Sequence, residues 1–434
     1  MCCCSRSSPR SCRRFGRSTA SSQEARPVPT LALGYLLLTG HFAGRLFKTL
    51  RLPKLTGYIA AGIVVGPSAL GYLNESMVEN LKLVNGVAVA LIALTAGTEL
   101  SFRQMRGTLR AILWISGVAV VGTTVLLTGA VMALRGLLPF MASLSLFESG
   151  MIASVLGVVM VAQSPAVVMA LRDETESDGP VSQTVLGVVV LADLLVIVMF
   201  AVTSALAKAA MGGGTRVTEA ASALAWELFG SLGLGLLVGG LLALFARRVV
   251  SGLGLFLLVV MFAVAEGGQR LHLDALLVAL AAGVFIRNVT SAAEKVQHSV
   301  EAYSLPIYTL FFAVAGANLH LDVLSAVGPA AIVFVLVRGV GLYQGTRVAA
   351  RIAGASPAVQ RFAGFGLLPQ AGLALALSLL FARTFPEFGS DAGALTLGVV
   401  ALNELIAPVF FRLALIRSGE AGRRRSGTDT ERAA

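Results

Sequence analysis

The stretch Leu186–Phe200, LGVVVLADLLVIVMF, is an apolar run with an acid at its centre. Between Asp178 and Lys208 the only charged residue is Asp193. About 20 apolar residues suffice to cross the hydrocarbon core as a helix. An acid in mid-membrane costs about 3 kcal/mol on insertion scales, and intramembrane acids generally mark ion or proton pathways. We therefore predict that Asp193 binds a cation and a proton in turn.

The composition of the whole chain indicates a polytopic membrane protein. Of its 434 residues, 56% are hydrophobic and 13% are charged, whereas soluble domains carry about 25% charged residues. The net charge of +11 comes from Lys and Arg in short loops and at both tails, which is typical of topology signals and not of a nucleic-acid-binding face. The sequence carries no Walker, Rossmann or zinc-ligand spacing. We expect no enzyme activity, no cofactor and no nucleic-acid partner.

Apolar runs recur along the chain and predict an all-α protein with about 13 transmembrane helices. The predicted spans are Val28–Leu46, Leu55–Leu73, Leu83–Leu100, Ala111–Leu134, Ser149–Leu171, Val181–Ala207, Leu224–Ala246, Leu253–Ala265, Ala275–Ile286, Tyr303–Leu319, Val323–Ala350, Phe362–Ala382 and Ala392–Ile416. No large soluble domain remains in this sequence, so we expect any such regulatory domain to be a separate subunit.

Lys and Arg are concentrated in alternate loops and in the C-terminal tail. By the positive-inside rule these loops and the C-terminus are cytoplasmic, which places the N-terminus outside. The loop Arg172–Asp178 is acidic yet falls on the cytoplasmic side, and acids count little in the rule. Because the Arg-rich segment 1–26 would lie outside, we expect a disordered leader or a misassigned start. The compact loops suit a bacterial inner membrane.

Three pairs of similar stretches occur in the same order in the two halves of the chain. They are Gly57–Gly62 with Leu277–Gly283, Ala96–Leu100 with Ala315–Leu319, and Val188–Leu194 with Val399–Leu405. Six spans on each side of a single linker span make the halves face opposite ways, which is the inverted-repeat plan of secondary transporters. The predicted segments are the leader 1–26, a first repeat 27–222, a linker helix 223–248, a second repeat 249–418 and a tail 419–434.

The fifth and twelfth spans each carry a proline at corresponding positions. Pro165 lies in Ala162–Ala166 and Pro369 lies in Leu367–Gly372, beside Gln370. Proline lacks an amide hydrogen and disfavours helical geometry in the residue before it. Paired interruptions in two repeats are the best sequence indication of a transport site. We predict two discontinuous helices whose freed backbone groups face protein or water.

Candidate ion ligands lie at the first break and in the sixth span. A carboxylate oxygen of Asp193 is a hard ligand suited to a small cation, and a proton competes for the same atom. Gln163 and Ser164 add polar groups at the break. We predict Asp193, Ser164 and Gln163 as the ion- and proton-binding residues.

Two further charged residues lie deep in the second repeat. Arg338 is the only charge between Asp322 and Arg347, and an arginine does not release its proton in a protein. We expect Arg338 to neutralise an acid, with Asp193, Glu404 or Glu266 as the candidates. Glu404 matches Asp193 in the repeat; we favour it as the partner of Arg338, and the alternative is a second ion-linked acid. Glu266, like Glu99, lies near a span end, where an acid can reach interfacial water.

Seven stretches together resemble the monovalent cation/proton antiporter family. They are Leu55–Pro67, Ala96–Leu100, Ser164–Val168, Leu191–Leu195, Phe311–Leu319, Leu367–Gly372 and Leu402–Pro408. The resemblance implies a homodimer of thirteen-helix protomers, with a core domain that holds crossed fifth and twelfth spans beside Asp193. It also implies elevator-type alternating access. Many members have a second acid or an asparagine where this chain has Ala192. With one carboxylate we predict electroneutral exchange of one Na⁺ or K⁺ for one H⁺.

Two other transport functions fit the same plan. One is a gated potassium-efflux protein of the same fold. The other is a sodium-coupled organic-anion symporter, for which the break offers only Gln163, Ser164 and Gln370 as polar side chains. Neither the cation nor the direction of transport follows from spacing alone.

Overall fold

The computed structural model of the chain describes residues 29–142, 144–211, 222, 225–248, 252–301, 303–319 and 321–424. Within these ranges every regular element is helical. The predicted leader 1–26 and the end of the tail lie outside the described residues.

The helices of the first half, in chain order, are α1 (Pro29–Thr49), α2 (Lys54–Val65), α3 (Glu75–Glu79), α4 (Lys82–Glu99), α5 (Phe102–Met105), α6 (Leu109–Ile115), the π-helical turn η1 (Ser116–Val121), α7 (Gly122–Ala133), the short turns η2 (Arg135–Leu137) and η3 (Pro139–Met141), α8 (Leu146–Val161), α9 (Pro165–Thr175) and α10 (Pro180–Ala210). Those of the second half are η4 (Trp226–Gly230), α12 (Ser231–Arg248), α13 (Leu253–Leu271), α14 (Ala275–Val289), α15 (Ala293–Glu301), α16 (Ser304–Ala317), α17 (Leu321–Ile352), α18 (Pro357–Gly366), α19 (Gly372–Thr384) and α20 (Gly389–Arg417).

The chain is an integral membrane protein. Eight helical segments of the described ranges are long and apolar enough to cross a bilayer, or nine if the bent pair formed by Ala293–Val300 and Leu305–Ala317 counts as one span. Each of the predicted spans overlaps one or more helices; the span Ala111–Leu134 covers α6, η1 and α7, and the span Leu55–Leu73 continues past the end of α2 at Val65. Thirteen crossings stay a prediction, because several of these helices are too short to pass on length alone.

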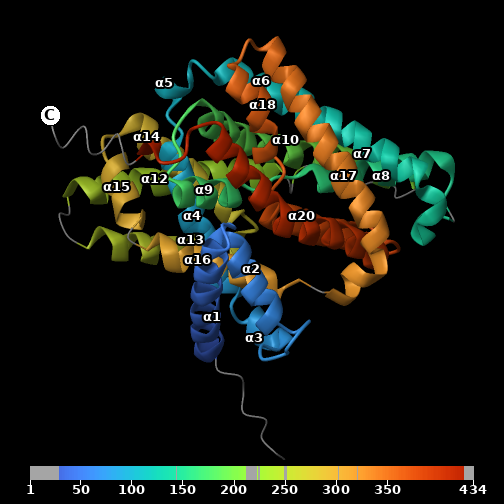
Figure 1. The fold of residues 1–434 in the computed structure, drawn as a ribbon, viewed down its shortest axis with the longest axis horizontal. Helices are drawn as coiled ribbons and strands as arrows, with labels where there is room; N and C mark the ends of the chain where they lie inside the picture. Colours follow the sequence, from blue (N-terminus) through green and yellow to red (C-terminus); the bar gives the residue numbers. More distant parts are fainter. Residues whose placement is uncertain are drawn as a thin grey trace, which may run out of the picture.

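The helices pack into two bundles. The first, called the α4 bundle, contains α1, α2, α4, α12, α13, α14 and α16, which pack chiefly on one another. The second, called the α10 bundle, contains α6 to α10 and α17 to α20. Figure 1 shows α1, α2 and α16 on one side of the molecule and α6, α7 and α17 on the other. Each bundle therefore draws helices from both halves of the sequence.

Two glycine contacts in the α4 bundle reproduce the internal repeat. Gly62 of α2 lies so close to α16 that an added Cβ would overlap the Ala313 carbonyl, and Gly316 of α16 lies equally close to α2. Gly97 of α4 and Gly283 of α14 approach each other's backbones in the same way. The sequence repeat pairs Gly62 with Gly283 and Gly97 with Gly316. The contact between α2 and α16 in one place therefore corresponds, by the repeat, to the contact between α14 and α4 in the other. Small residues permit such close crossings of membrane helices.

The two predicted helix breaks are confirmed. The first separates α8 from α9 at residues 162–164, and α9 starts at Pro165. The second separates α18 from α19 at residues 367–371, which include Pro369. At the first break Ala162 and Ser164 both have extended backbone. Four half-helices therefore end inside the α10 bundle.

Candidate functional site

Asp193 lies near the middle of α10, on the buried face that also carries Val189, Val196 and Phe200. Its side chain is 2% exposed. Neither carboxylate oxygen has a hydrogen-bond partner among the described residues. Buried polar groups are nearly always paired, so one without a partner needs an explanation such as an absent ion or water.

A cavity of about 190 Å³ opens beside Asp193. It lies between the two bundles. Its lining comes from α10 (Asp193, Ile197), from the start of α19 (Gly372, Leu373, Ala376), from α4 (Val89) and from the start of α14 (Asp274, Leu276, Leu277). Because the two acids are the only charged residues of this lining, a cation that enters finds carboxylate oxygens among mostly apolar walls.

Asp274 is the residue that the sequence analysis missed. It is the N-cap of α14, where its Oδ1 accepts hydrogen bonds from the amides of Leu276 (2.7 Å) and Leu277 (3.3 Å). An Asp immediately before the apolar run from Ala275 is a recognised helix-start signal. That signal indicates a cap; the pairing with Asp193 across the cavity depends on how α14 and α10 pack.

Arg338 of α17 joins the ends of the two broken helices. Its side chain is fully buried. The guanidinium donates to the backbone carbonyls of Met160 (2.8 Å), Ala162 (2.9 Å), Leu367 (3.3 Å) and Leu368 (2.6 Å). These carbonyls belong to the C-terminal ends of α8 and α18, which lack partners within their helices. A cation there also opposes the negative ends of two helix dipoles.

Asn403 and Gln370 complete this brace. The side-chain oxygen of Asn403 on α20 accepts a long bond from Arg338 (3.5 Å), and its amide donates to Gln370 (2.9 Å). Gln370 in turn donates to the carbonyl of Met160 (2.8 Å). The polar atoms of Gln370 are thus engaged in holding the two breaks together.

The prediction that Arg338 pairs with a buried acid was wrong. Within the described residues its five N–H bonds reach four carbonyls and one amide oxygen, and no ion pair to Asp193, Glu404 or Glu266 forms. Glu266 pairs instead with Arg270, one turn further along α13. The freed carbonyls outcompete a carboxylate because the guanidinium fork reaches both breaks at once.

Glu404 of α20 is 2% exposed, and both its carboxylate oxygens lack hydrogen-bond partners within the described ranges. It is therefore not the ion-pair partner of Arg338 that the sequence analysis favoured. It does not line the cavity of Asp193 either.

Gln163 and Ser164 lie in the first break but do not line the cavity of Asp193. Gln163 is buried and both atoms of its amide lack partners among the described residues. The hydroxyl of Ser164 accepts from the amide of Val167 (3.3 Å) and so caps α9. Gln163 has free polar atoms for a ligand, whereas Ser164 already has a structural contact.

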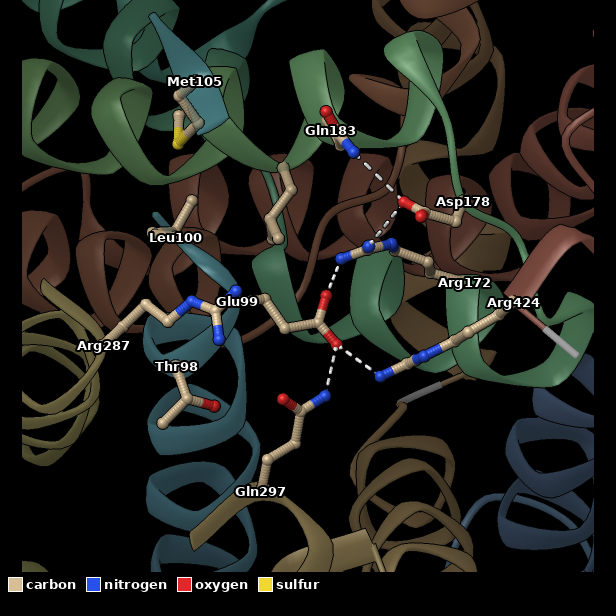
Figure 2. Close-up of a pocket in the computed structure, with 11 residues that line it drawn as sticks. Thr98, Glu99, Leu100, Met105, Arg172, Asp178, Gln183, Arg287, Gln297 and Arg424 are labelled. Carbon is tan, nitrogen blue, oxygen red and sulfur yellow. Dashed lines mark hydrogen bonds and ion pairs between the residues drawn. The ribbon is translucent and has the colours of Figure 1, made fainter. Parts of the chain in front are cut away.

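A second polar centre, called the Glu99 cluster, consists of Glu99, Arg172, Asp178, Gln297 and Arg424. Figure 2 shows Glu99 between the guanidinium groups of Arg172 and Arg424. Gln297 also donates to Glu99 (3.3 Å), and Arg172 contacts Asp178 (3.3 Å). The cluster borders a cavity of about 210 Å³. Since Glu99 ends α4 and Arg172 belongs to α9, these buried ion pairs connect the two bundles.

The Glu99 cluster also shows that several predicted cytoplasmic segments lie together. Arg424 of the tail contacts both Glu99 and Asp173. The loop between α1 and α2 also ends here, because the amide of Lys54 donates to Glu174 (2.9 Å). The acidic segment Arg172–Asp178 is accordingly balanced by Arg424 of the tail, which pairs with Asp173, and by its own Arg172, which pairs with Asp178.

No group of three or more His, Cys, Asp or Glu side chains able to hold a metal occurs in the described part of the chain. The pair formed by Asp193 and Asp274 is the charged lining that faces a cavity between the bundles. Such a sparse set of oxygens suits a transiently bound ion better than a structural metal, which takes six or more ligands when it is calcium.

Comparison with known proteins gives a consistent result. The family described as sodium/hydrogen exchanger, transmembrane, matches residues 34–417. The Na(+)/H(+)-K(+) antiporter GerN of Bacillus cereus is 27% identical over 305 residues, which cover 67% of this chain and 71% of that protein. The sodium proton antiporter MjNhaP1 of Methanocaldococcus jannaschii at pH 8 has a TM-score of 0.65 at 15% identity, over 90% of this chain and 98% of that chain. An electron-microscopy structure of MjNhaP1 gives 0.66 at 14% identity, over 89% and 97%. At these identities the structures show the fold alone.

Proposed function

Because the chain belongs to the sodium/hydrogen exchanger family, we propose that it exchanges Na⁺ or K⁺ for H⁺ across a membrane, with Asp193 as the carrier. The observation that carries the proposal is the state of Asp193: it is buried, its two oxygens have no partner in the described structure, and it lines a cavity between the bundles. A carboxylate held in a permanent ion pair would not be available to bind a cation and a proton in turn.

The exchange follows from competition for the same oxygens. A bare carboxylate in an apolar cavity is costly, so Asp193 is occupied either by a cation or by a proton. A cation that arrives at one face displaces the proton, and a proton that arrives at the other face displaces the cation. Coupling results because the two cannot be bound to one carboxylate together. Gln163, with its unpartnered amide, is the proposed additional ligand, and Ser164 is the weaker one because its hydroxyl caps α9.

Alternating access requires the two bundles to move relative to each other. The proposal is elevator-like: the α10 bundle slides against the α4 bundle and carries Asp193 with it. Two features support it. The cavity of Asp193 has walls from both bundles. The brace of Arg338 ties both breaks to α17 and α20, so the α10 bundle has the internal bonds to move as one body.

Electroneutral exchange, one cation for one proton, follows if Asp193 is the only exchanging group. Arg338 keeps its charge and is fully engaged with carbonyl and amide oxygens. Glu404 does not line the cavity of Asp193. The net charge that crosses with each cycle is then zero.

The test is transport by the purified protein in proteoliposomes, followed by dissipation of a pH gradient on addition of sodium, potassium or lithium. Wild-type protein should exchange, and Asp193→Asn should not, while it still elutes as a folded protein. Glu404→Gln is the matched control, since Glu404 is also a buried acid without partners, and it should still exchange. Exchange that survives in Asp193→Asn would refute the carrier role. A rate that depends on an imposed membrane voltage would refute the 1:1 stoichiometry.

The same assay separates the other transport functions. A gated potassium-efflux protein would release potassium without a counter-movement of protons, and a symporter would need an organic anion. The cation is proposed as Na⁺ or K⁺. GerN, a relative at 27% identity, is named for both ions.

The assembly and location are proposed from the family and from the charge pattern. We expect a homodimer in a bacterial inner membrane with the C-terminus in the cytoplasm. Molar mass by light scattering in detergent, and protease access to the tail in oriented vesicles, test these two statements.

A further inference from the structure

Asp193 has no acidic neighbour in sequence, since Ala192 precedes it. The structure supplies one in space. Asp274 lines the same cavity from the start of α14, in the α4 bundle, whereas Asp193 belongs to the α10 bundle. We propose that Asp274 is the second carboxylate of the cation site, contributed by the opposite bundle; this inference rests on the function proposed above.

The position of Asp274 is fixed by its backbone surroundings. Its amide donates to the hydroxyl of Ser231 at the start of α12 (2.9 Å), and its Oδ1 accepts both capping bonds of α14. The other oxygen, Oδ2, makes no hydrogen bond with any described residue. One oxygen thus holds the helix start, and the other is available to a cation in the cavity.

The apolar lining of the cavity strengthens the attraction between Asp274 and a cation. Apart from the two acids, the cavity is lined by apolar side chains and the start of α19. Attraction between a cation and a carboxylate is several times stronger in such surroundings than in water. The unpartnered and 98% buried carboxylate of Asp193 shows independently that the cavity is built for a positively charged occupant.

The role of Asp274 differs from that of Asp193. Because Asp274 is held in a helix cap on the α4 bundle, it does not travel with the α10 bundle. It raises the affinity for the cation in the conformation in which the two carboxylates share the cavity, and a sliding movement of the α10 bundle removes that contribution. Asp274 is therefore an affinity-setting ligand, and Asp193 remains the carrier.

The experiment uses variants that separate charge from capping. Asn and Ser cap helices about as well as Asp, so Asp274→Asn and Asp274→Ser preserve the start of α14 and remove the charge. Asp274→Glu keeps the charge. Glu266→Gln is the control for a lost acid elsewhere on the α4 bundle, because Glu266 is partly exposed on α13 and pairs with Arg270.

Exchange is measured in proteoliposomes against sodium chloride, with choline chloride to hold ionic strength constant. We expect the apparent KM for sodium to rise about tenfold in Asp274→Asn and Asp274→Ser, which corresponds to about 1.4 kcal/mol, with maximal rates that stay within about twofold of wild type. Asp274→Glu should recover most of the affinity, and Glu266→Gln should match wild type.

A second readout does not depend on turnover. Sodium should raise the melting temperature of the detergent-solubilised protein, because a ligand that binds only the folded state stabilises it. The sodium concentration for half of this rise should increase about tenfold in Asp274→Asn. An unchanged KM and an unchanged half-point in both uncharged variants would overturn the role of Asp274. The two proposals fail in different proteins. The carrier role of Asp193 stands if wild type exchanges and Asp193→Asn does not, whatever the Asp274 variants do. It fails if wild type does not exchange or if Asp193→Asn still does.

Discussion

Replacing Arg338 with lysine tests whether this residue is a brace or a part of the ion site. The substitution keeps the positive charge but replaces five N–H donors in a planar fork with three on one nitrogen. Arg338 serves four carbonyls and the side-chain oxygen of Asn403. At least two of these five hydrogen bonds would therefore be lost.

The magnitude follows from the lost hydrogen bonds. A hydrogen bond to a charged group contributes about 1.5–3 kcal/mol, so the loss of two should destabilise the protein by about 3–6 kcal/mol. At roughly 2 °C per kcal/mol, the lower end of the range for chains of about 150–250 residues, the melting temperature should fall by about 6–12 °C. Arg347→Lys is the matched control, because Arg347 is exposed on the same helix.

The assay is thermal melting in detergent with and without sodium, read by the fraction that still elutes as a folded species. We expect a large fall for Arg338→Lys, almost none for Arg347→Lys, and the same sodium-dependent rise in all three proteins, since Arg338 does not line the cavity of Asp193. A variant that melts with wild type, or that loses the sodium effect alone, would refute the brace.

Two further substitutions test the packing of the bundles. Gly97→Val should destabilise strongly, by about 3 kcal/mol or more, because a Cβ would overlap the backbone of α14 at Leu280; Gly129→Val, where nothing lies within 4 Å of an added Cβ, is the control in the same melting assay, and equal melting of the two would contradict the close crossing. Glu99→Gln should cost about 3 kcal/mol, the lower end for a broken buried pair, since it removes the carboxylate between Arg172 and Arg424 but leaves Arg172 its contacts with Asp178 and with the Ser177 carbonyl. Glu79→Gln breaks only an exposed pair with Lys82 and should leave stability nearly unchanged. A similar fall in melting temperature in both glutamate variants would mean that the buried ion pairs of the Glu99 cluster add nothing to stability.

The breaks at Pro165 and Pro369 were predictable because they are local. A proline removes an amide donor and restricts the residue before it wherever it occurs in a helix, and the repeat showed that the two interruptions correspond. The acid Asp193 was equally visible, since no neighbour within its span carries charge. The family assignment rested on motifs of the same local kind.

The partners of these residues were not predictable from the sequence. Arg338 was expected to meet an acid, and it meets backbone carbonyls that have no signature of their own. Any residue can offer a carbonyl, so only the approach of α8 and α18 to α17 reveals which ones are free. Glu404, expected as the partner of Arg338, has no hydrogen-bond partner within the described structure.

Sequence patterns alone predict a membrane protein with a repeated plan, two broken helices and an acid at depth in each repeat, Asp193 and Glu404. Those properties depend on hydropathy, proline and charge, which are read residue by residue. The residue that lies opposite Asp193 depends on how distant helices pack. Asp274 is 81 positions away along the chain (274 − 193), and the tertiary arrangement brings the start of α14 and the middle of α10 to one cavity at the bundle boundary. Its sequence position marks a helix cap, and a contact between distant segments has no local pattern from which it can be inferred.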